Sequence, residues 1–132
     1  MEILIDLHNH TVASGHAYSS MEELISRAVK KNVRVLGISD HAPALPGGPN
    51  IFHFGNLFVV PREIDGLILL KGVETNIMDF EGNIDVPARI LKRLDYAIAS
   101  LHPPCIEPGT KEENTNAIIG AMKNPFVKII GH

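Results

Sequence analysis

The sequence is poor in three features that mark common classes of protein: cysteines, long apolar runs and clusters of basic residues. Its 132 residues contain one cysteine, Cys105. A single cysteine excludes a disulfide framework and makes the reducing cytoplasm the expected location. Cys105 follows two prolines and has no activating partner near it in the sequence, so we interpret it as structural or incidental.

No apolar run approaches the roughly 20 residues that a membrane helix needs. The N-terminus lacks the basic segment and the small-residue cleavage site of a signal peptide. The formal net charge is -3, without a basic run, which argues against nucleic acid and anionic membrane surfaces as partners. Hydrophobic residues make up 45% of the chain, which is enough for the core of one ordinary domain.

Short apolar runs alternate with segments of helical periodicity. The expected strands are Ile3–Leu7, Val33–Ser39, Leu67–Val73, Tyr96–Leu101 and Phe126–Ile130, with a further short strand within Phe58–Ile64. The expected helices are Met21–Lys31, which follows a capping-box sequence at Ser20–Glu23, then Pro87–Leu94 and Glu112–Lys123. The proline- and glycine-rich segment Ala42–Gly55 is expected to be a long loop. This alternation predicts an α/β fold with a parallel sheet buried on both faces, either doubly wound or a barrel.

Each of the five main apolar runs leads into a residue that can bind a metal ion. These residues are His8 and His10, Asp40 and His41, Glu74, His102, and His132. The carboxyl ends of parallel strands lie at one edge of a sheet, and in βα barrels that edge carries the active site. If the sheet curls, these side chains should therefore meet at one place.

The pair His8 and His10 is itself informative, because residues two apart in an extended segment point to the same side. Both imidazoles can then reach one metal ion. Six of the seven histidines lie at strand ends or in the loop after the first strand. Imidazole suits zinc, iron, copper or manganese, and among the strand-end residues Glu74 is the one carboxylate placed to bridge two such ions.

Other polar residues, near these strand ends or in the loops, allow more than one interpretation of their role. Asp40 either fixes the tautomer of an imidazole or caps a turn, and Asp6 either supports the histidines or binds a neighbouring loop. His16 is the weakest proposed ligand, because an exposed loop histidine needs no explanation. His53 either packs against aromatic residues or lines the mouth of a substrate pocket. Arg62 is a candidate phosphate clamp, with a solvated arginine as the alternative.

Several motifs resemble the PHP (polymerase and histidinol phosphatase) family, in particular its stand-alone phosphatases with three zinc ions. They are Asp6–Thr11 (DLHNHT), Ser14–Ser19 (SGHAYS), Ile38–His41 (ISDH), Gly72–Ile77 (GVETNI), Leu101–His102 and Ile130–His132. These pieces occur in the family's order and cover the whole chain.

The resemblance implies a distorted barrel of seven βα units, of which residues 1–132 would form the N-terminal five. It also implies a ligand set for up to three ions, with zinc expected first and manganese or iron as alternatives. The first ion would be held by His8, His10 and Glu74, the second by Glu74, His102 and His132, and the third by His16 and His41.

The family continues beyond the fifth strand to an Asp-x-His motif that this sequence lacks. We therefore expect a truncated PHP domain that forms an oligomer or pairs with a missing C-terminal portion. For the complete enzyme the resemblance implies hydrolysis of a small phosphoester by a hydroxide generated between two ions that Glu74 bridges. Three alternatives stay open: an amidohydrolase-type metal hydrolase, an appendage of a DNA polymerase, and a fragment that binds metal without turnover.

Overall fold

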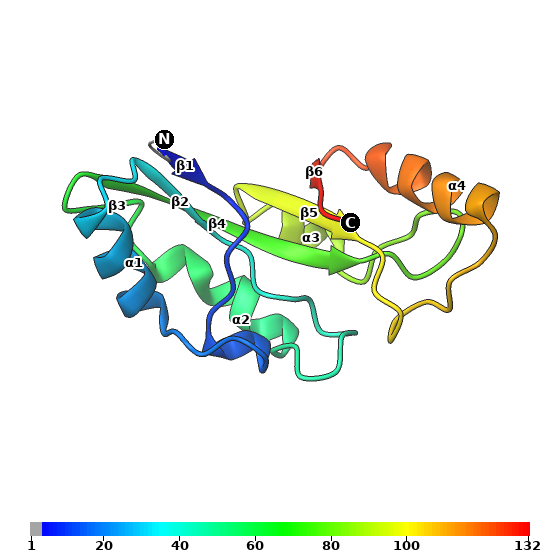
Figure 1. The fold of residues 1–132 in the computed structure, drawn as a ribbon, viewed down its shortest axis with the longest axis horizontal. Helices are drawn as coiled ribbons and strands as arrows, with labels where there is room; N and C mark the ends of the chain where they lie inside the picture. Colours follow the sequence, from blue (N-terminus) through cyan, green and yellow to red (C-terminus); the bar gives the residue numbers. More distant parts are fainter. Residues whose placement is uncertain (1–3) are drawn as a thin grey trace.

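The computed structural model describes residues 4–132, in which parallel strands form one curved sheet (Figure 1). The strand order is β1-β2-β4-β5-β6, and β3 pairs with β4 in the antiparallel sense. The strands are β1 (Ile5–Asp6), β2 (Val35–Ile38), β3 (Glu63–Ile64), β4 (Leu67–Asn76), β5 (Tyr96–Ser100) and β6 (Val127–Ile130). Along the chain, each new parallel strand is added on the same side of the sheet as the one before it, as in a barrel. This confirms the predicted α/β class and the barrel-like alternative, here as a curled half-barrel.

The helices begin where side chains satisfy the free N–H groups of the first turn. They are α1 (Met21–Lys30), α2 (Ile51–Asn56), α3 (Ala88–Leu91) and α4 (Lys111–Met122), with 3-10 helices η1 (Val12–Ser14) and η2 (Leu57–Val59). The predicted capping box is present at α1, where Ser20 and Glu23 each bind the other's backbone N–H. A second capping box, formed by Thr110 and Glu113, starts α4.

Three expectations need correction. The segment Ala42–Gly55 is not wholly a loop, because Asn50 caps α2 and the apolar side chain of Phe54 is buried in the core. Glu74 does not follow its strand but lies inside β4, which continues to Asn76. The first strand ends at Asp6 rather than at Leu7, and its predicted start, Ile3, lies outside the described residues.

The helices cover one face of the sheet. Leu67 and Leu69 of β4 pack against α1, and Val73 packs against a cluster that includes Phe54 of α2. The prediction of burial on both faces is confirmed for β5, where all five residues are buried, but not for the start of β4. On the inner face Ile68, at the start of β4, is 41% exposed.

A tyrosine crosses the inner face. The hydroxyl of Tyr96 on β5 donates a hydrogen bond of 2.7 Å to the backbone oxygen of Leu7, which follows β1. Its ring fills the space above Gly37 of β2 and Gly72 of β4, where any Cβ atom would collide with it. One side chain therefore spans four strands and helps to set their curvature.

In the described part of the chain, no helix is both long enough and apolar enough to cross a membrane.

Candidate metal centre

The carboxylate of Glu74 lies at the centre of the carboxyl edge of the sheet and is fully buried. Ring nitrogens of five histidines surround it. Oε2 lies 3.1 Å from His8 Nε2, 3.2 Å from His10 Nε2 and 3.0 Å from His41 Nδ1, and Oε1 lies 3.5 Å from His102 Nε2 and 3.6 Å from His132 Nε2. These histidines follow β1, β2, β5 and β6, so residues from both edges of the curled sheet reach one carboxylate.

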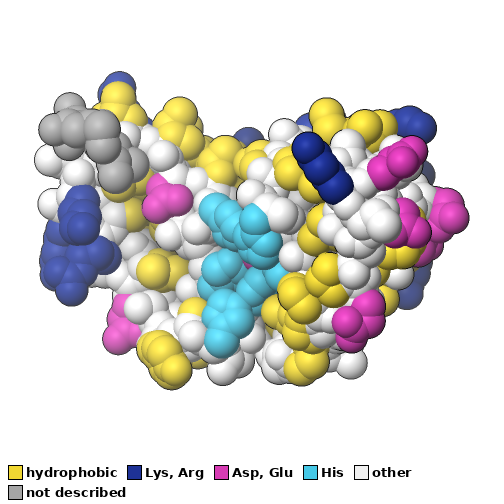
Figure 2. All heavy atoms as spheres, turned by 45° about the vertical axis from the view of Figure 1, so that its right-hand side comes forward, with side chains coloured by type: hydrophobic (Ala, Val, Ile, Leu, Met, Phe, Trp, Pro, Cys, Tyr) yellow, Lys and Arg dark blue, Asp and Glu magenta, His cyan; other side chains and the backbone are white. Residues whose placement is uncertain are grey.

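The cluster is closed on one side and open on the other. The side chains of His41 and His102 are each 8% exposed, whereas those of His8 and His132 are 38% and 62% exposed. Figure 2 shows histidine side chains gathered in the middle of one face of the molecule. A small molecule can therefore reach the open side from solvent.

Buried acceptor atoms in the cluster lack the partners that such atoms normally have. Among the described residues, Glu74 Oε2, His41 Nδ1 and His102 Nε2 are buried and make no hydrogen bond. Unpaired polar groups are costly to bury. A cation placed among these atoms would remove that cost, so the cluster fits a metal ion.

Three sets of residues have ligand atoms within 4.8 Å of one another: His8, His10 and Glu74; His10, His16 and His41; and His41, Glu74 and His102. The sets share members, as expected for neighbouring ions. Three protein ligands with a free fourth position are typical of catalytic zinc sites, whereas structural sites are closed by four.

His16 lies close to the cluster although its side chain is exposed. Its ring centre is 5.3 Å from that of His10 and 4.5 Å from that of His41. His132 lies beside His102 on the other flank, with ring centres 5.0 Å apart. Gly131 permits this approach, because a Cβ atom there would collide with Ser100 Oγ.

The protonation states suit metal binding, which needs neutral imidazole and ionised carboxylate. Burial lowers the pKa of His41 to about 4, helped by repulsion from His10, His102 and His16 and opposed by attraction to Glu74. Burial acts to raise the pKa of the Glu74 carboxyl, but polar contacts with His10, His102 and Ser100 outweigh it and hold that pKa well below its usual range.

Asp40 is buried behind the cluster rather than within it. Its Oδ1 accepts hydrogen bonds from Thr11 N (2.6 Å) and Ser14 Oγ (2.7 Å), and its Oδ2 accepts one from Thr11 Oγ1 (2.9 Å) and lies 3.3 Å from His53 Nε2. Burial acts to raise the pKa of Asp40, but the contacts with His53, Ser14 and Thr11 outweigh it and lower that pKa.

Ser14 connects Asp40 to two histidines. Its hydroxyl donates to Asp40, accepts from the backbone N–H of His41 (3.0 Å) and lies 3.4 Å from His10 Nδ1. Asp40 thus reaches His10 and His41 only through Ser14, whereas it contacts the imidazole of His53 directly. Ser14 entered the sequence analysis only as the first residue of the motif Ser14–Ser19, and no spacing rule pointed to its contacts with Asp40 and the histidines.

His102 has its own supporting residues, which the sequence analysis missed. Its Nδ1 lies 2.6 Å from Asn76 Oδ1, and the amide nitrogen of Asn76 donates to Asp85 Oδ2 (2.7 Å). Asn76 lies two residues after Glu74 on the same strand, so the strand alternation could have placed it on the same face. Asp85 lies in the loop before α3, and no spacing rule points to it.

The remaining predicted residues lie apart from the cluster. Arg62 is exposed and pairs with Asp95 (2.6 Å), which precedes β5, so it lies at the opposite edge of the sheet from Glu74. Its position does not support the predicted phosphate contact. His53 packs edge-on against Phe54, as one reading expected, and belongs to none of the three ligand sets.

Asp6 accepts a weak hydrogen bond from the backbone N–H of His8 (3.4 Å). Cys105 is a partly buried free thiol, and burial raises its pKa.

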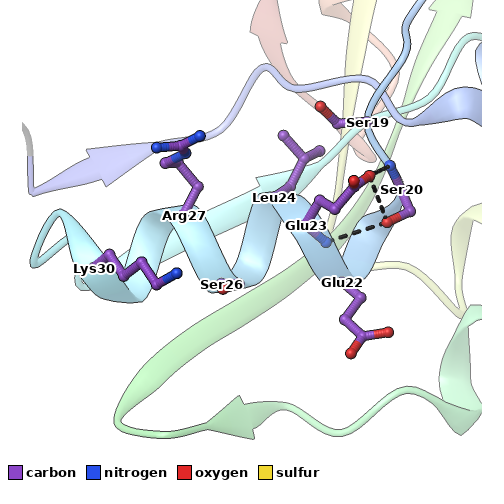
Figure 3. A pocket seen from close by; sticks show the side chains of 8 residues that line it. All are labelled: Ser19, Ser20, Glu22, Glu23, Leu24, Ser26, Arg27 and Lys30. Carbon is purple, nitrogen blue, oxygen red and sulfur yellow. Dashed lines mark hydrogen bonds between the residues drawn. The ribbon is translucent and has the colours of Figure 1, made fainter.

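An open hollow lies along α1 (Figure 3). It is lined by polar residues that include Ser19, Glu23 and Lys30. The Glu23 carboxylate is already engaged in the capping box. The hollow contains none of the cluster residues and is not part of the metal centre.

The curled parallel sheet and the histidine–glutamate cluster at its carboxyl edge define a class: an α/β barrel-type protein with a site that could hold metal. The family model of the PHP domain matches residues 6–129. The chain therefore belongs to the PHP domain family, as its motifs suggested.

Among similar proteins are a probable phosphatase of Caldanaerobacter subterraneus subsp. tengcongensis, 54% identical over 133 residues, and one of Clostridium botulinum, 51% identical over 132 residues. A third, from Acetivibrio thermocellus, is 48% identical over 132 residues. Each comparison covers the whole of this chain. It covers 52%, 54% and 55% of the length of the three relatives, respectively. The chain spans about half the length of the curated relatives it matches and corresponds to their N-terminal part.

Proposed function

We propose that this chain carries the metal site of a phosphatase that hydrolyses small phosphomonoesters. The observation that carries the proposal is the buried Glu74 carboxylate with five imidazole nitrogens within 3.0–3.6 Å. The relatives that are probable phosphatases support the reaction class.

In this proposal Glu74 would hold an ion with each of its two oxygens, because the two oxygens face different histidines. Oε2 faces His8, His10 and His41, and Oε1 faces His102 and His132. Ser100 Oγ donates a hydrogen bond of 2.6 Å to Oε1 and so orients the carboxylate. Bound divalent ions would supply Lewis acidity, which activates water near neutral pH and offsets charge on phosphate oxygens.

The histidines around Glu74 have different roles in this proposal. Burial keeps His41 neutral at physiological pH, ready to bind a cation. His8 and His132 lie on the open side and would face the substrate. Zinc is the proposed metal, with up to three ions in the complete protein and manganese or iron as alternatives, because the ligands are imidazole nitrogens and one carboxylate. Nucleic acid is not a proposed partner, given the net charge of -3.

The test combines metal analysis with hydrolysis of p-nitrophenyl phosphate by the purified chain, with Glu74→Ala beside it. Bound metal and hydrolysis that are both lost in the variant are the expected result. Absence of bound zinc, manganese or iron would contradict the proposal. Metal binding without hydrolysis would assign to this chain the metal site alone, with turnover requiring more of the protein.

Amide and lactone substrates in the same assay separate the phosphatase from an amidohydrolase. Preferential hydrolysis of either would overturn the proposed reaction.

A further inference from the structure

The imidazole of His102 is held from behind by a buried amide. His102 Nδ1 and Asn76 Oδ1 are 2.6 Å apart, and both residues are buried. On the other side of the ring, Nε2 faces Glu74 Oε1 at 3.5 Å and has no hydrogen-bond partner within residues 4–132. Nδ1 of the ring is therefore hydrogen-bonded and Nε2 is not. The partner of Nδ1 determines which of the two nitrogens carries the proton.

The orientation of the Asn76 amide follows from its other neighbours. One end of the amide faces two acceptors, Asp85 Oδ2 at 2.7 Å and the backbone oxygen of Ala42 at 3.3 Å. A carboxylate only accepts hydrogen bonds, and so does a carbonyl oxygen. The NH2 group must lie at this end, which leaves the oxygen of Asn76 facing His102.

An amide oxygen can only accept, so His102 Nδ1 must donate to it and carries the ring proton. Neutral imidazole has one N–H, and Nε2 then presents a lone pair to Glu74. Without this arrangement the opposite tautomer would be favoured, because an N–H on Nε2 could donate to the carboxylate of Glu74.

We propose that Asp85 and Asn76 are positioning residues that fix His102 in the tautomer with its proton on Nδ1, which keeps Nε2 free to bind a cation shared with Glu74. The inference deepens the proposed function, because it names residues outside the cluster that prepare one of its ligands. Partners of this kind hold metal-binding histidines in many proteins, and their loss weakens metal affinity by about 10- to 100-fold.

Asp85 is itself held firmly enough to act in this way. Besides the Asn76 amide, it accepts hydrogen bonds from the backbone N–H groups of Asn76 (2.9 Å) and Ala44 (3.0 Å). Its carboxylate therefore ties the end of β4 to the loop after β2. In Asp85→Asn one oxygen becomes an NH2 group, so three donors compete for a single oxygen and the hold on the Asn76 amide weakens.

The chain offers a matched control. Asp79 accepts from the backbone N–H of Asn83 (3.0 Å) and from its side-chain amide (2.7 Å) in an exposed turn, and it belongs to none of the three ligand sets. Asp79→Asn therefore disturbs the same kind of Asp–Asn pair at a site unconnected to the cluster.

The experiment reads the tautomer of His102 directly, by 15N NMR of the imidazole in the metal-free chain in mildly alkaline buffer. Zinc affinity is measured separately by competition with a chelator. We expect the proton on Nδ1 in the unmodified chain and in Asp79→Asn. In Asp85→Asn, and more fully in Asn76→Leu, we expect protonation of Nε2 and zinc affinity weakened about 10- to 100-fold.

A proton on Nε2 of His102 in the unmodified chain would overturn the proposal, and this measurement needs no variant to fold. Equal tautomers and equal zinc affinities in Asp85→Asn and Asp79→Asn would overturn it as well. A chain that binds zinc without phosphatase activity would leave the proposal intact, because neither readout depends on turnover.

Discussion

Replacing Glu74 with glutamine probes the centre of the cluster with the smallest possible change of shape. The amide can still accept the hydrogen bond from Ser100 Oγ, which is 2.6 Å from Oε1 in the unmodified chain. It cannot supply the negative charge that two of the three ligand sets contain. The variant should therefore fold and lose most of its affinity for zinc.

The size of the effect can be worked out from linkage. Zinc at about 1,000 times its dissociation constant stabilises a protein by about 4 kcal/mol. For a chain of 132 residues this raises the unfolding temperature by about 15 °C. Loss of a residue that merely orients a ligand weakens metal affinity by up to about 100-fold, so loss of the shared ligand itself should cost at least that much. At the same zinc concentration the variant would then gain only about 1.4 kcal/mol, or about 5 °C.

The assay is thermal unfolding followed by circular dichroism, with and without zinc, for each protein. Because the zinc-induced shift is compared within each protein, differences in metal-free stability cancel. Glu113→Gln is the control, since Glu113 lies in the capping box of α4 and belongs to none of the ligand sets. An unchanged shift in Glu74→Gln, or an equal loss in Glu113→Gln, would refute the reasoning.

Three further changes test other parts of the structure. Folding lowers the pKa of His41 from 6.5 to about 4. The metal-free chain should therefore lose about 3 kcal/mol of stability as the pH falls from 6.5 to 4, measured by urea unfolding. The sign follows because the unfolded chain binds the extra proton in this window. Gly72→Ala would place a Cβ atom 2.6 Å from Tyr96 Cε1, and we expect a loss of about 1–3 kcal/mol in urea unfolding. Ser14→Ala should cost about 1–3 kcal/mol, because it leaves buried polar groups without partners, and should also weaken zinc binding in a chelator competition.

Each of these has a control. His41→Gln should remove its share of the pH dependence, and an unchanged slope would contradict the assigned titration. Tyr96→Ala should make Gly72→Ala nearly neutral, because the clashing ring is gone; an additive loss would contradict the proposed contact. Ser26→Ala, on the exposed face of α1, should have no effect on zinc affinity, and a loss equal to that of Ser14→Ala would count against a specific role for Ser14.

The sequence was most informative where one physical rule links many residues. Strand ends in a parallel sheet share an edge, and this rule alone brought His8, His41, Glu74 and His102 to one place. It worked because it requires only the direction of each strand, which the apolar runs indicate. Small errors in strand length, such as the extension of β4 beyond Glu74, did not disturb it.

The rule was weakest where a contact depends on loop geometry. Asp85 reaches Asn76 across a loop, and Ser14 lies beneath Asp40 because of the turn at η1. Arg62 was proposed as a phosphate contact because of its charge. Its position depends on how the segment before β4 turns so that β3 pairs antiparallel with β4. Local periodicity carries no information about such paths.

The ring of Tyr96 also fills the layer of the inner face next to the metal centre. Gly72 precedes Glu74 by two residues on the same face of β4, so the two residues are about 7 Å apart along the strand. Side chains from several strands could have filled this layer separately, but the glycines at positions 37 and 72 leave it to one ring, which is hydrogen-bonded to the backbone after β1. The packing next to Glu74 therefore depends on a single rigid aromatic side chain.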